Sequence, residues 1–150
     1  MMKPALLSIL TVSIFGCASD ESPGSATQGN TSQTLSVQRC SSPPSSDAYA
    51  LGDVAAAGHD LVVHVQTGGG CAEHRFAVCW DGAVYDTQPG TIQLALRHDA
   101  HGDTCDARLL WDLHVDVSLV LESFDAPLQM TVIGATAQIA GTTGSVLVTD

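Results

Sequence analysis

The sequence predicts an all-β fold: a small disulfide-bonded β-sandwich of immunoglobulin-like architecture, with a small β-barrel as the alternative. Three observations carry this prediction. Short runs rich in Val, Thr and Leu alternate apolar with polar residues, which is typical of half-buried strands. Clusters of Gly, Pro, Asp and Ser separate the runs and are typical of turns. Four cysteines beyond residue 38 offer two cross-links for a domain of this size.

The β domain is expected to span residues 48–150. Within it, residues 60–67, 74–80 and 91–98 alternate most clearly and are expected to form strands. Residues 108–121 alternate too, and either one long strand or two shorter ones would explain them. No segment of this region has a convincing amphipathic helical pattern.

The second and third of these strands are expected to pair as an antiparallel hairpin. Asp81-Gly82 opens its loop, which has about ten residues. A register that keeps both apolar faces on one side places Phe76 opposite Leu96 and His74 opposite His98.

The N-terminal sequence predicts an export signal. Lys3 precedes thirteen weakly polar or apolar residues, 4–16, a run too short to span a membrane and typical of a signal peptide. The run ends in Ile-Phe-Gly-Cys, which resembles the lipobox of bacterial lipoproteins. That resemblance implies that residues 1–16 are removed and that Cys17 is lipidated, palmitate included. Ala18 then implies the outer membrane, on its periplasmic or its surface face. The alternative is an ordinary cleaved signal with a chance cysteine.

Residues 17–47 are expected to be a lipidated cysteine followed by a flexible tether. The segment is rich in Ser, Thr, Gly and Pro and has few large apolar residues with which to order itself. The whole chain has sixteen acidic and five basic residues, for a net charge of −11. A protein this acidic is repelled by phosphate backbones, so we expect no nucleic-acid partner.

The four remaining cysteines are expected to form disulfides, because an even number in an exported chain is typical of cross-linking. Four cysteines allow three pairings. The predicted hairpin puts Cys71 and Cys105 at the same end of its strand pair, which favours that bridge. Cys40 and Cys79 then form the second.

Histidines and aspartates concentrate in HDAHGDTCD, residues 98–106. Imidazoles at a strand pair suit zinc or copper, whereas the D-x-H-x-D spacing weakly suggests a calcium loop. Thr104 stands where a calcium loop has glycine. The alternative is a polar loop whose side chains make structural hydrogen bonds. The candidate metal ligands are His74, His98, Asp99, His101 and Asp103.

Three stretches of the body stand out together: GGGCAEHRF (68–76), HDAHGDTCDA (98–107) and LLWDL (109–113). With them the body resembles uncharacterised envelope lipoproteins of Gram-negative bacteria and, loosely, the NigD-like lipoproteins. The resemblance implies a β-sandwich and no known activity. It also implies one structural unit formed by Cys71, His74, Phe76, His98, Asp103 and Cys105.

These observations predict a lipid-anchored envelope protein whose β domain has an interaction or structural role. No nucleophile, metalloprotease or phosphate-binding motif is present, so we expect no enzyme and no cofactor. Its expected partners are the membrane, through the lipid, and an envelope protein or glycan. The alternative is a metal-binding lipoprotein that uses the cluster around residues 98–106.

Overall fold

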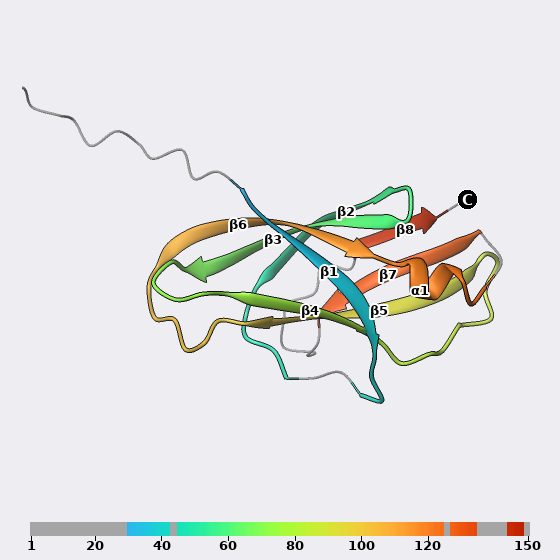
Figure 1. Ribbon diagram of the computed structural model, residues 1–150, viewed down its shortest axis with the longest axis horizontal. Coiled ribbons are helices and arrows are strands. Elements are labelled where there is room, and N and C mark those ends of the chain that lie inside the picture. The colour runs from blue at the N-terminus through green and yellow to red at the C-terminus, as the bar shows by residue number, and fades with distance from the viewer. Residues whose placement is uncertain (1–29, 43–44, 125–126, 135–143, 149–150) are drawn as a thin grey trace, which may run out of the picture.

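A computed structural model describes residues 30–42, 45–124, 127–134 and 144–148 and is built almost entirely of strands (Figure 1). The all-β prediction is therefore confirmed. A one-turn helix, α1 (Ser118–Leu121), is the exception. The strands are β1 (Thr31–Arg39), β2 (Ala50–Ala57), β3 (Asp60–Gly69), β4 (Arg75–Trp80), β5 (Gly90–Asp99), β6 (Ala107–Asp116), β7 (Leu128–Gly134) and β8 (Gly144–Val148).

The strands form a single eight-stranded sheet in the order β2-β3-β6-β1-β4-β5-β7-β8. Its two edge strands, β2 and β8, pack against each other, so the sheet is nearly closed (Figure 1). This barrel-like sheet fits the alternative prediction better than an immunoglobulin-like sandwich. Strand β1 joins the two halves of the sheet, because residues 31–36 pair with β6 and residues 37–39 pair with β4, both in parallel.

The central place of β1 corrects the predicted tether, which assigned residues 31–39 to flexible chain. Leu35 and Val37 are two positions apart and both point into the core, at 8% and 5% exposure. Two large apolar residues are too few to stand out in a composition average. The neighbouring strands supply backbone partners on both sides, and this tertiary pairing orders the segment. The predicted signal peptide, Cys17 and the tether up to residue 29 lie outside the described residues.

The hairpin of β4 and β5 exists, but its predicted register is wrong by two residues. Phe76 lies opposite His98 and Val78 opposite Leu96. A shift of two positions keeps every side chain on its own face of the sheet, so the apolar pattern cannot distinguish the two registers.

Residues 108–121 do not continue as strand to Leu121. Strand β6 ends at Asp116, whose Oδ1 accepts a hydrogen bond of 2.9 Å from the Ser118 amide and starts a turn. The turn leads into α1, which buries Val120 and leaves Leu119 45% exposed. Among the described residues, no helix is long and apolar enough to cross a membrane.

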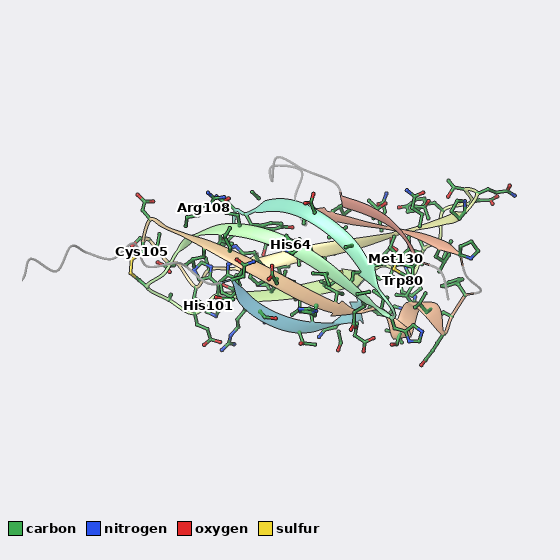
Figure 2. All side chains as sticks on the ribbon, turned by 90° about the horizontal axis from the view of Figure 1, so that it is seen from above. His64, Trp80, His101, Cys105, Arg108 and Met130 are labelled. Carbon is green, nitrogen blue, oxygen red and sulfur yellow. A yellow bond between two sulfur atoms is a disulfide. The ribbon has the colours of Figure 1, made fainter. Side chains whose placement is uncertain are left out.

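The core fills the interior of the sheet with side chains from alternate strand positions, as the alternation predicted. Figure 2 shows Trp80 and Met130 toward one end of the sheet and His101 and Cys105 at the other. The largest fully buried apolar side chains include Trp80, Leu61, Ile92, Leu94, Leu96, Leu113 and Met130. The end that holds Cys105 carries the predicted site.

Candidate functional site

Both predicted disulfides are present. Cys71, just beyond β3, is bonded to Cys105, just before β6, with a Cα–Cα distance of 5.9 Å. Cys40, which follows β1, is bonded to Cys79 on β4, with a Cα–Cα distance of 5.7 Å. The first bridge ties the β3–β4 loop to the β5–β6 loop and so closes the end of the sheet where the predicted site lies.

Asp103 anchors that end through backbone hydrogen bonds. Its Oδ2 accepts the amides of Gly70, Cys71 and Ala72 at 2.8, 2.9 and 2.8 Å, and its Oδ1 accepts the amide of Cys105 at 2.9 Å. The bonds from Cys105 and Ala72 hold the pKa of Asp103 well below its ordinary value. The carboxylate therefore stays ionised and clamps the two loops that the disulfide joins.

Two buried histidines extend from this carboxylate into the core. His74 Nε2 lies 3.2 Å from Asp103 Oδ2, and His74 Nδ1 lies 2.8 Å from His98 Nε2. The other nitrogen of His98, Nδ1, lies 3.2 Å from the carbonyl oxygen of Ala48. The side chains of His74 and Asp103 are fully buried, and His98 is 1% exposed. We call these three residues the buried relay.

Hydrogen bonding occupies the ring nitrogens of the buried relay. Three contacts use the four nitrogens: one to the carbonyl oxygen of Ala48, one between the two rings, and one to Asp103. Burial, followed by the charge of His74, lowers the pKa of His98. The relay is thus a buried hydrogen-bonded network whose members depend on one another.

Aromatic rings enclose the two imidazoles. Trp111 stacks on His74 with ring centroids 5.7 Å apart, and Phe76 stacks on His98 at 4.8 Å. Gly69 makes room on the remaining side. Its φ is +135°, and a Cβ there would overlap the His74 ring. The unit that the lipoprotein resemblance implies is thus present in the structure.

The two other predicted metal ligands do not join this relay. His101 Nδ1 lies 2.7 Å from the carbonyl oxygen of Glu73, and the Asp99 carboxylate lies 3.6 Å from Arg97. Both side chains are more than one third exposed. The backbone is left-handed at His101, with φ of 51°, and its ring contacts the Glu73 carbonyl rather than either buried histidine.

The geometry of the buried relay suits a hydrogen bond between its two rings and does not suit a zinc ion shared by them. Two nitrogens that bind one tetrahedral zinc ion at 2.0–2.1 Å stand about 3.3 Å apart, whereas the facing nitrogens of His74 and His98 are 2.8 Å apart. Among the described residues, one group of potential ligand atoms converges, formed by Cys71, Asp103 and Cys105. Its two sulfurs are bonded to each other, so neither is the thiolate that a metal requires.

A second His–Asp group lies on the outer face of β3 and β6, away from the residues that the sequence analysis singled out. His64 Nδ1 lies 2.7 Å from Asp112 Oδ1, and Asn30 Nδ2 donates to both carboxylate oxygens at 3.0 Å. The bond from Asn30, then that from His64, lowers the pKa of Asp112, and the charge of nearby His114 lowers it further. We call His64, Asp112 and His114 the outer strip.

The outer strip is open to solvent. The side chain of His64 is 46% exposed and lies midway along the sheet (Figure 2). A surface hollow of about 360 Å³ adjoins it, lined by residues that include His64, Asp112, Leu110 and Gly52. The sequence signal for the outer strip is that residues 64, 112 and 114 all occupy outward-facing positions of alternating strands. This signal identifies the group only once β3 is known to pair with β6.

Comparison with known proteins identifies a fold but no family. No family model matches the chain, and no curated protein matches it. A crystal structure described as "Putative TOXIN related protein" from Parabacteroides distasonis ATCC 8503 is similar, with 14% identity, 77% of this chain covered and a TM-score of 0.57. A NigD-like immunity protein from Bacteroides caccae ATCC 43185 gives 17% identity, 79% coverage and a TM-score of 0.49. This chain spans 61% and 60% of their lengths, and such likenesses concern the fold alone.

Proposed function

We propose that the chain is a lipid-anchored cell-envelope protein, at the outer membrane, whose β domain is a rigid, non-enzymatic module that binds an envelope protein or glycan. The observation that carries the proposal is the pair of disulfides among the four body cysteines. Such bonds persist in oxidising compartments outside the cytoplasm. They agree with the export signal of residues 1–16 and the lipobox-like sequence that ends at Cys17.

The buried relay supports the non-enzymatic part of the proposal. A catalytic imidazole must reach a substrate, yet the side chains of His74 and Asp103 are fully buried. Apart from the Asp103–Cys105 bond, their polar contacts join the β3–β4 loop to the β5–β6 loop or to strand β5. The relay therefore acts as a brace that fixes one end of the sheet, which leaves the outer surfaces for a partner.

Lipid labelling tests the anchor. Cells that produce the full-length chain are fed alkyne-tagged palmitate, and the protein is then captured and probed for the tag. We expect labelling of the wild-type chain and none of Cys17→Ser, because the thioether to the lipid forms only on the cysteine sulfur. An unlabelled wild-type chain, or a labelled Cys17→Ser chain, would show that the proposed anchor is wrong.

A further inference from the structure

The register between β3 and β6 brings an exposed histidine, His64, and a half-buried one, His114, onto one patch of the outer face. His64 lies opposite Asp112, and Val62 lies opposite His114, so the two histidines are diagonal neighbours across the antiparallel pair. Diagonal neighbours on one face have Cα atoms about 7–8 Å apart, a distance that long or aromatic side chains bridge. Two imidazoles at this spacing can each place a nitrogen 2.0–2.1 Å from one shared ion.

Asp112 prepares His64 for this role. In the 2.7 Å contact, the Nδ1–H group of His64 donates to Asp112 Oδ1, so the Nε2 atom carries the free lone pair. Metal-binding histidines show the same arrangement, in which a carboxylate fixes the tautomer and orientation of the ring. Asn30 in turn fixes the carboxylate through both of its oxygens.

We propose that the outer strip binds a divalent transition metal of the zinc and copper class through His64 and His114, with Asp112 as the positioning residue. Imidazole nitrogen suits these ions, whereas calcium and magnesium prefer oxygen ligands. Two protein ligands leave the remaining coordination positions to water, which the 46% exposed side chain of His64 allows. The net charge of −11 also favours the approach of a cation. This site goes beyond the proposed envelope function and differs from the predicted cluster at residues 98–106.

Calorimetric titration with Zn²⁺ alone tests the site, on the full chain purified in detergent. We expect one ion per chain, and His64→Ala and His114→Ala should each weaken binding by about tenfold or more. His101→Ala is the matched control, because it removes an exposed imidazole at the end of the sheet and should leave the affinity unchanged. Denaturation curves equal to that of the wild type verify that the two strip variants are folded.

Imidazole NMR identifies the ligands directly. Zinc should shift the ring signals of His64 and His114 and leave those of His74 and His98 in place. In the metal-free protein, Asp112→Ala should abolish the preference of His64 for the Nδ1–H tautomer and should also weaken zinc binding. Wild-type affinity in His64→Ala, zinc-shifted His74 or His98 rings, or no binding at millimolar zinc would each overturn the proposal. None of these outcomes bears on palmitate labelling, so the two proposals fail separately.

Discussion

The buried relay and the outer strip use the same chemical groups in opposite surroundings. Each contains two histidines and one aspartate, and in each the aspartate lies within hydrogen-bonding distance of a histidine nitrogen. In the relay all four ring nitrogens are engaged inside the protein. In the strip the Nε2 atom of His64 has its lone pair free, on a side chain that is 46% exposed.

The difference shows that burial and saturation, rather than residue type, separate a structural cluster from a binding site. A buried polar group without its partner costs more free energy than a formed hydrogen bond contributes, so the relay is stable only when complete. An exposed imidazole loses little when unpaired, because water replaces the missing partner. Substitutions in the two regions should therefore have effects of different size.

The largest effect is expected from His74→Ala. The change leaves a cavity, removes the ring between His98 and Asp103, and takes from the buried Nε2 atom of His98 its partner, whereas Asp103 keeps its amide donors. We expect the free energy of unfolding to fall by about 3–5 kcal/mol, measured by urea denaturation with the disulfides intact. A loss below about 1 kcal/mol would mean that the relay adds nothing beyond an exposed pair.

Sequence patterns predicted the strands whose residues alternate between apolar and polar. They did not predict the features that depend on which strands pair with each other. The apolar positions of residues 60–67, 74–80 and 91–98 follow from period two, and both disulfides follow from placing Cys71 and Cys105 at one end of a hairpin. The role of β1 was hidden, because its order comes from β6 and β4 rather than from its own composition.

The site was predicted in part for the same reason. The stretch 98–106 supplied His98 and Asp103, and the hairpin added His74, so the relay was within reach of local reasoning. His64 and His114 come together only through the pairing of β3 with β6, which lie far apart in the sequence. Asp99 and His101 belong to the same stretch, and nothing in its sequence distinguishes them from His98 and Asp103 as ligands. In the structure both side chains are more than one third exposed.

An intermediate effect is expected from acid, through His98. Burial, then the charge of His74, holds the pKa of His98 below its ordinary 6.5, so near and below that value the folded state binds fewer protons than the unfolded state. Stability that depends on neutral His98 is present above pH ~6.5 and is lost as the pH falls. The lowered pKa of Asp103 acts in the same direction at a lower pH, below about 3.9. Urea denaturation between pH 8 and pH 4.5 should show this decline in the wild type.

His98→Gln isolates the contribution of the imidazole to this acid dependence. Glutamine keeps an amide that can donate and accept hydrogen bonds but cannot take up a proton in this range. We expect the variant to be less stable than the wild type at pH 7.5 and to lose less stability between pH 7 and pH 5. Parallel curves for the two proteins would show that the acid sensitivity arises elsewhere in the chain.

The smallest effect is expected from His64→Ala, measured in urea without added metal. The contact with Asp112 is exposed on the His64 side, so water and ions compete for both partners, and such pairs contribute about 0–1 kcal/mol. The outward position of the ring also means that its removal opens no cavity in the core. We expect the free energy of unfolding to fall by less than about 0.5 kcal/mol. The weakened zinc binding of this variant is measured separately, by calorimetric titration. A loss as large as that of His74→Ala would make the outer strip a second structural brace, and the distinction between the two regions would then be wrong.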